Sequence, residues 1–198
     1  MWMLIAEASQ VELNFDTLAD ICQRDLGLSY KLLRFVNNSM FAARQPITSL
    51  KLAMVSMGEP ELKKFIALLA LANLSDGVQD ERLTLALVRA RFCDLLAEQK
   101  RLSSNPPSAF LTGLFSNVHE IIEQPQQLML EQLPLQVEIK QALLTHSGLL
   151  GKMLQLTLSF ERGDWEQTLS LEQKISGISE LADVYQDAVR WADNILTK

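Results

Sequence analysis

Two adjacent stretches decide the fold: LSYKLLRFVNNSMF at residues 28–41 and AARQPITSLKLAMVSMG at residues 42–58. Apolar residues in each stretch recur three and four positions apart, which is the spacing of one face of an α-helix. Thr48 is placed to cap the second helix, and Gly58 suits the left-handed position that follows a helix end. Asn37 falls where the first helix stops, and its amide can satisfy backbone groups there. We therefore predict two helices that pack through their apolar faces.

The rest of the chain continues the helical pattern, and no stretch alternates as a β-strand would. Further helices are expected over residues 60–74, about 80–100, 109–124, from 125, from 134, about 149–160 and about 179–196. The clearest interruption is RLSSNPPS at 101–108, and a subdomain boundary would fall there. We predict an all-α fold, an irregular multi-helix bundle, in a single domain that spans residues 1–198.

The composition is that of a globular domain, with 198 residues of which 48% are hydrophobic and 21% charged. The longest apolar run, FIALLALA at 65–72, is well short of the ~20 residues that a membrane span requires. The start, MWMLIAE, lacks the basic residues of a signal peptide. Cys22 and Cys93 lie in apolar helical patterns without a CxxC motif, so we expect buried free thiols. We expect a cytoplasmic protein that does not contact a membrane.

The net charge of −6 comes from the second part of the chain: residues 106–198 hold 6 basic and 12 acidic residues, whereas residues 1–105 hold 12 of each. This balance argues against a general nucleic-acid-binding protein. The segment TLADICQRDLGLSYKLLRFVNN, residues 17–38, superficially fits a helix-turn-helix. Most of its second helix is needed for packing, so few side chains remain to read DNA bases. DNA binding is therefore kept only as an alternative.

Motifs for catalysis are weak. The chain contains no GxxxxGK[ST], GxGxxG or GxSxG motif, so phosphate-binding loops and a nucleophile elbow are unsupported. Its two histidines are His119 and His146. His119 and Glu123, four residues apart, could share a helix face and begin a metal site, but the second histidine of the zincin pattern is missing. His146 precedes Ser147–Gly148 and fits a C-terminal helix cap. We expect no metal or other cofactor.

The charges of the two opening stretches all have the same sign. Between Leu26 and Gly58 the charged residues are Lys31, Arg34, Arg44 and Lys51, and no acidic residue occurs. They could border one surface, which would then be a basic patch facing an acidic partner or an anionic ligand. The alternative is that they are scattered solubilising charges balanced by acids from elsewhere in the chain.

The same stretches resemble the central motif of HDOD domains, a Leu-Ser-x-Lys-Leu-Leu-Arg-x-x-Asn-Ser helix followed by Ile-x-Ser-x-x-x-Ala-x-x-x-x-Gly. Asn38 stands where the family often has the serine, which is here Ser39. The positions that match are Leu28, Ser29, Lys31, Leu32, Leu33, Arg34, Asn37, Ile47, Ser49, Ala53 and Gly58. Among them we expect structural roles for Leu32, Leu33, Asn37, Ile47, Ser49, Ala53 and Gly58.

The second half is similar to the C-terminal part of HDOD domains that follow an EAL domain. The segments that carry this likeness are LVRARFCDLLAE, AFLTGLFSNVHEIIEQP, ALLTHSGLLGKML and VYQDAVRWAD. The resemblance implies an all-α fold related to the HD phosphohydrolases but without their metal-binding His and His-Asp residues. The chain contains no His-Asp pair.

What the resemblance implies about function is a non-catalytic signal-transduction domain in bacterial, cyclic di-GMP-related signalling. It would act by binding a protein partner or an adjacent signalling domain, of the EAL type in the proteins it most resembles. The first alternative is a metal-dependent HD-type phosphohydrolase, which would retain close to stoichiometric metal on purification. The second is helix-turn-helix DNA binding, which a salt-dependent mobility shift would reveal.

Overall fold

The computed structural model describes residues 13–23, 49–74, 81–102 and 107–196. All regular structure in these ranges is helical, which confirms the all-α prediction. The chain divides into two compact units, Met1–Ala70 and Leu71–Lys198. Residues 101–108 lie inside the second unit, and the proposal of one domain over residues 1–198 stays a prediction. No helix in the described ranges combines the length and the apolar character needed to cross a bilayer.

The first unit is built around the core between α2 (Phe15–Gln23) and α4 (Leu50–Leu74), whose last residues belong to the second unit. Leu18, Cys22, Ala53, Met54 and Met57 are buried in this core, whereas Ile21 and Leu50 are only partly buried against it. Phe65, Ile66 and Leu69 of α4 belong to the same apolar cluster. Hydrophobic packing of these two helices therefore holds the first unit together.

A kink at Gly58 divides α4, as the sequence predicts. Gly58 has φ 75° and ψ 167°, and Pro60 begins the next helical segment two residues later. The positive φ is confirmed, although ψ places the residue outside the left-handed helical region. A β-carbon is strained at this φ, whereas glycine adopts it freely. Proline needs no intrahelical N–H bond in a first turn, so the pair Gly58–Pro60 ends one helix and starts another.

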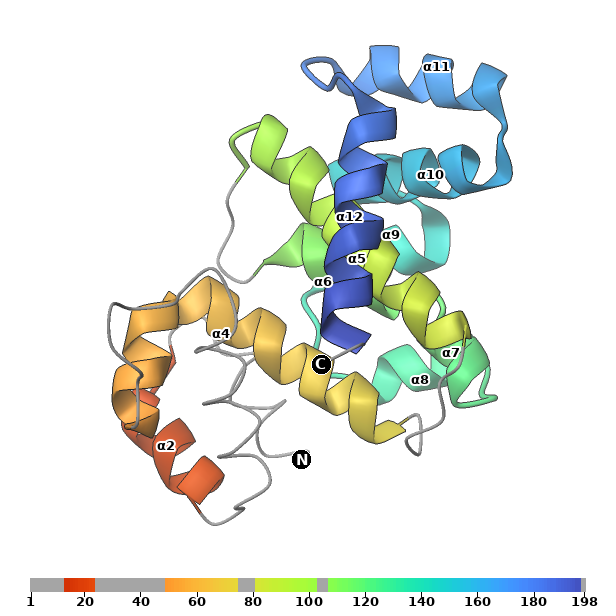
Figure 1. Cartoon of the computed structure of the whole chain (residues 1–198). Helices are drawn as coiled ribbons and strands as arrows, with labels where there is room; N and C mark the ends of the chain where they lie inside the picture. Colours follow the sequence, from red (N-terminus) through yellow and green to blue (C-terminus); the bar gives the residue numbers. More distant parts are fainter. Residues whose placement is uncertain (1–12, 24–48, 75–80, 103–106, 197–198) are drawn as a thin grey trace. The chain divides into compact units, whose positions relative to one another are not determined.

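The second unit is organised around α5 (Glu81–Gln99), against which α6 (Ser108–Phe115) and α12 (Leu181–Leu196) pack most closely (Figure 1). Phe92 and Leu96 of α5 are completely buried. The predicted helix over 80–100 is confirmed, and its buried residues lie on more than one side of the helix. Gly113 lies where α6 meets α5, and a β-carbon built on it would be 2.3 Å from the Arg89 carbonyl oxygen.

The remaining helices follow as α7 (Val118–Ile121), α8 (Gln126–Gln132), α9 (Val137–Thr145), α10 (Gly148–Arg162) and α11 (Trp165–Ile175). The single helix expected over 109–124 is divided into α6 and α7 at Ser116 and Asn117. The α9 helix starts three residues after Pro134, and α12 starts at Leu181 instead of about 179. The α11 helix was not predicted. Both cysteines are buried and free, as expected.

Candidate functional site

Only part of the predicted basic surface lies in the described residues. Lys31, Arg34 and Arg44 fall outside them, so their placement stays a prediction. Lys51 is exposed on α4 and forms an ion pair with Asp16 of α2. More than half of each side chain is exposed, so the pair contributes little to stability. The charge of Lys51 is therefore balanced by an acidic residue from elsewhere in the chain, as the alternative of scattered solubilising charges predicts.

The family-motif residues on α4 have structural positions. Ser49 precedes the helix: its hydroxyl oxygen accepts a hydrogen bond from the Leu52 N–H at 3.4 Å, and its carbonyl accepts from the Ala53 N–H at 2.9 Å. Ser49 thus contributes to the cap of this helix, whereas Thr48, the predicted cap, lies outside the described residues. Ala53 is completely buried, and Gly58 forms the kink. Leu32, Leu33, Asn37 and Ile47 lie outside the described residues.

The outer side of the same helical segment is apolar. Leu52 and Val55 are 56% and 54% exposed, three residues apart, beside the exposed Lys51. Side chains at this spacing are neighbours on a helix surface. Large apolar side chains next to a charge are typical of protein-contact surfaces more than of a catalytic site. Sequence reasoning missed this pair because helical spacing alone does not say which apolar residues are left uncovered.

The two histidines occupy helix ends that are far apart in the sequence. His119 lies in the short helix α7, with Nε2 3.9 Å from Glu120 Oε1. Because α7 ends at Ile121 and Glu123 has φ 53°, His119 and Glu123 do not share a helix face, so the pair that could have begun a metal site does not form. His146 closes α9 in the left-handed conformation, with its N–H bonded to the Ala142 carbonyl at 3.1 Å. The capping role predicted for His146 is confirmed.

The cap geometry gives a test of the role of His146. Its φ of 52° and ψ of 29° cost a residue with a β-carbon more than they cost glycine. His146→Gly should therefore raise the free energy of unfolding by about 0.5–1 kcal/mol in urea titrations. His146→Ala is the control, because it keeps the strain and should bring no gain. A loss of stability in His146→Gly would instead show that the imidazole makes a stabilising contact.

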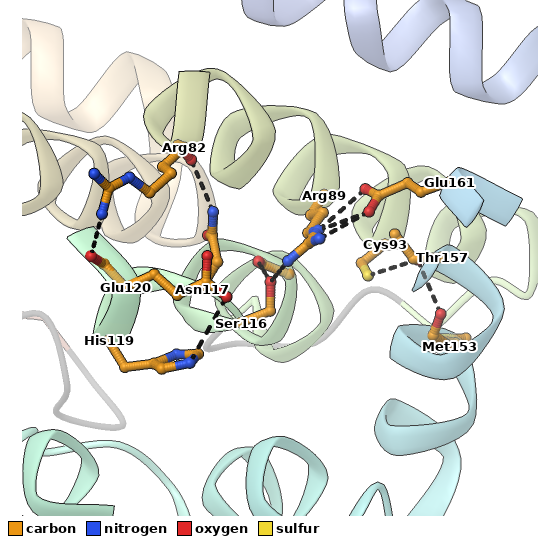
Figure 2. A network of polar contacts seen from close by, with 11 residues as sticks. Arg82, Arg89, Cys93, Ser116, Asn117, His119, Glu120, Met153, Thr157 and Glu161 are labelled. Carbon is orange, nitrogen blue, oxygen red and sulfur yellow. Dashed lines mark hydrogen bonds and ion pairs between the residues drawn. The ribbon is translucent and has the colours of Figure 1, made fainter. Parts of the chain in front are cut away.

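Figure 2 shows a polar network in the interior of the second unit that the sequence did not reveal. Arg89 of α5 holds Glu161 of α10 through two donors: Nε lies 3.1 and 3.0 Å from the two carboxylate oxygens, and Nη2 lies 2.9 Å from Oε2. The Arg89 Nη1 also donates to Ser116 Oγ at 3.3 Å. The side chains of Arg89 and Glu161 are only 13% and 9% exposed. The pair therefore joins α5 to α10 in a nearly dry environment.

Burial governs the titration of groups in this network. Desolvation raises the pKa of the Glu161 carboxyl, and the Arg89 guanidinium partly offsets that rise. Burial also raises the pKa of the Cys93 thiol to about 12, so the thiol stays neutral at physiological pH. Its Sγ lies 3.3 Å from Thr157 Oγ1, whose own proton goes to the Met153 carbonyl at 2.9 Å. Cys93 is thus a packing residue and not a nucleophile.

A second set of contacts ties the start of α5 to α7. The Asn117 side-chain amide donates to the Arg82 carbonyl at 2.8 Å, and the Arg82 guanidinium donates to the Glu120 carbonyl at 2.5 Å (Figure 2). Asn117 is completely buried, so this bond is shielded from water. Among the described residues, no group of three or more His, Cys, Asp or Glu side chains is placed to hold a metal ion. The polar groups in Figure 2 are therefore arranged to connect helices.

The comparisons with known proteins agree with the motif on α4. The HDOD domain model matches residues 2–124, more than half of the chain. The chain belongs to the HDOD family. It is 33% identical over 196 residues to the cyclic di-GMP phosphodiesterase CdgJ of Vibrio cholerae, a match that covers 97% of this chain and 45% of that protein. It is 31% identical over 196 residues to the uncharacterised protein YuxH of Bacillus subtilis, covering 98% of this chain and 47% of YuxH.

The chain thus spans less than half the length of the curated relatives that it matches. No solved structure gives a significant match to it. The family model includes the Ser49–Gly58 segment, and the alignments with CdgJ and YuxH extend over nearly the whole chain, including residues after 124.

Proposed function

We propose that this HDOD domain is a non-catalytic regulatory module of cyclic di-GMP-related signalling, which acts by binding another signalling protein or an adjacent domain of the EAL type. The observation that carries the proposal is the coverage of the Vibrio relative: almost the whole chain aligns with less than half of a protein named for cyclic di-GMP hydrolysis. A module that forms part of a longer signalling protein can regulate the remainder through contacts between domains.

The described interior supports a scaffold role. Hydrolysis by the HD mechanism needs a metal held by His and Asp ligands to activate water. Here His146 serves a backbone turn, and Arg89 and Glu161 neutralise each other between α5 and α10. The buried Cys93 is protonated. These groups stabilise helix packing, which is what a binding module requires of its interior.

Catalysis by this chain itself is the second candidate, because the Vibrio relative is named as a phosphodiesterase. Purified protein incubated with cyclic di-GMP and Mg²⁺ or Mn²⁺ separates the two, with products resolved by liquid chromatography. We expect no turnover above the buffer control and less than stoichiometric metal by elemental analysis. Metal-dependent turnover that survives further purification would overturn the proposal.

The partner is identified by capture from the native host on immobilised protein, followed by mass spectrometry and by binding of the purified candidate. The expected partner contains a domain that makes or hydrolyses cyclic di-GMP, and its turnover rate should change when this chain is added. Binding without any change in that rate would contradict a regulatory role.

The predicted basic surface gives a mutational test of this association. Reversing Lys31 and Arg34 to Glu should slow association with the partner at least about 10-fold at low salt, because opposed charges mainly accelerate encounter. The difference should shrink as salt shortens the Debye length to about 8 Å and below. Lys51 is left unchanged because it already pairs with Asp16. Association rates are measured by surface plasmon resonance.

The matched control is charge reversal at Lys152 and Lys174, both exposed in the acidic half of the chain. This variant changes the net charge by the same amount. If both pairs slow association equally, or neither does, the surface around Lys31 and Arg34 has no special role in binding.

A further inference from the structure

The helix α11 carries an apolar surface that no residue of the described chain covers. Trp165 and Leu169 are 60% and 58% exposed, four residues apart on one side of the helix. A neighbouring side of the helix, formed by Thr168, Leu171 and Ile175, is buried. The surface made by Trp165 and Leu169, called the α11 face below, is therefore the uncovered part of an amphipathic helix.

The α11 face is held rigidly by the helices beneath it. The Trp165 ring meets Phe160 edge-on, with centroids 5.6 Å apart, and Phe160 in turn lies 5.1 Å from Tyr185. Thr168 Oγ1 and Ser159 Oγ form a buried hydrogen bond of 3.0 Å between α11 and α10. A fixed, half-exposed indole loses little conformational freedom on binding. This property is typical of the aromatic residues that dominate protein interfaces.

The charges around the α11 face determine what it can bind. Glu166 lies three residues before Leu169 and Glu172 three residues after it, which places them about 60° to either side of Leu169 around the helix. Asp164 is exposed at the N-terminal end. Lys174 is five residues beyond Leu169, which places it about 140° around the helix on another side. The apolar centre is therefore flanked by acids on both sides.

We propose that the α11 face binds a basic amphipathic segment of a partner protein, in which apolar side chains contact Trp165 and Leu169 while Lys or Arg residues meet Glu166 and Glu172. A second copy of this chain is a poor occupant, because antiparallel pairing of two α11 helices about Leu169 would bring the two Glu166 carboxylates together on one flank and the two Glu172 carboxylates together on the other. An anionic membrane surface would be repelled by the same carboxylates. Its charge preference is the opposite of the one predicted for a surface formed by Lys31 and Arg34.

The experiment uses two fluorescent 14-residue amphipathic peptides, one of Leu and Lys and the other of Leu and Glu, with binding followed by anisotropy at 0.15 M salt. The whole chain should bind the Leu–Lys peptide at least about 10-fold more tightly than the Leu–Glu peptide. Leu169→Glu should weaken Leu–Lys binding at least about 10-fold. Leu128→Glu, at an equally exposed leucine of α8, is the control and should change it less than about 2-fold.

Charge reversal tests the acidic flanks. The double variant Glu166→Lys/Glu172→Lys should lose the Leu–Lys peptide and gain affinity for the Leu–Glu peptide. Glu131→Lys/Glu138→Lys changes the net charge equally at exposed positions on α8 and α9 and should retain the original preference. Equal weakening by both double variants would mean that the peptide binds acidic surface in general, which overturns the proposal. Self-association of the chain that Leu169→Glu abolishes would overturn it as well.

Discussion

Replacing Gly113 with alanine should lower the free energy of unfolding by about 3 kcal/mol or more and prevent the second unit from folding at physiological temperature. The added β-carbon would lie 2.3 Å from the Arg89 carbonyl oxygen, 2.5 Å from the Arg89 carbonyl carbon and 2.7 Å from the Ala90 nitrogen. All three are backbone atoms of α5, so no side chain can rotate away. Relief requires α6 to move off α5, which exposes the core that these two helices share.

Urea titration followed by circular dichroism measures the effect, and Gly177→Ala is the control. Gly177 has φ 71° but open space around its α-carbon, so alanine there meets backbone strain without a clash. That strain should cost about 1–2 kcal/mol. If Gly113→Ala costs no more than Gly177→Ala, the close approach of α5 and α6 does not limit stability.

The sequence predicted much of the fold because glycine and proline mark helix ends through local geometry. Gly58 and Pro60 give the kink in α4, and Gly163, shortly after the end expected for the helix at about 149–160, ends α10 at φ 69°. Such positions depend on a few neighbouring residues and can be recognised in one sequence.

The helix α11 could not be predicted in the same way. Gly163 ends α10, and the next residue, Asp164, already caps α11 by accepting a hydrogen bond from the Gln167 N–H at 3.1 Å. In the sequence, a helix end followed immediately by a helix start has the residue pattern of a single loop. In addition, Trp165 and Leu169 are apolar but exposed, which obscures the periodicity of the buried side.

The polar network was missed for a different reason. Arg89 and Glu161 are 72 residues apart in the sequence, and nothing near either residue indicates its partner. The predicted basic surface depends equally on tertiary contacts, as the pairing of Lys51 with Asp16 shows. Helix boundaries follow from local sequence, whereas pairing of charges follows from packing.

Removing one member of the Arg89–Glu161 pair should have the second large effect. Arg89→Ala leaves the Glu161 carboxylate, which is only 9% exposed, without its cation and without three donor contacts. Breaking a buried ion pair in this way costs about 3–5 kcal/mol. Arg190→Ala is the control, because Arg190 and Asp187 form an exposed pair on α12. Its loss should change stability by less than about 0.5 kcal/mol.

Replacing both residues of the pair should lower the free energy of unfolding less than replacing Arg89 alone. Replacing both residues, as Arg89→Met/Glu161→Leu, removes the charges together with their desolvation cost. Such replacements in other proteins are often neutral or stabilising. We therefore expect the double variant to be more stable than Arg89→Ala by at least about 2 kcal/mol. The double variant could instead prove as unstable as Arg89→Ala. That result would mean that the contacts of the pair, including the bond to Ser116, stabilise the fold, and that an unpaired buried charge is not the cause of the loss.

The pH dependence of Arg89→Ala distinguishes an unpaired charge from a lost packing contact. Burial already raises the pKa of Glu161 in the folded protein, and Arg89 contributes most of what opposes that rise, so the pKa should rise further when Arg89 is removed. A carboxyl group with a raised folded pKa contributes stability below its unfolded pKa, and that contribution is lost as the pH rises through the folded pKa.

The deficit in stability of Arg89→Ala relative to the parent protein should therefore be smaller at pH 4.5 than at pH 7, as measured by urea titration at each pH. In Arg89→Ala/Glu161→Gln, which has no carboxyl at this position, the deficit should not become smaller at pH 4.5 than at pH 7. A deficit for Arg89→Ala that is equally large at both pH values would mean that the packing of the arginine side chain, and not the charge left on Glu161, determines the loss.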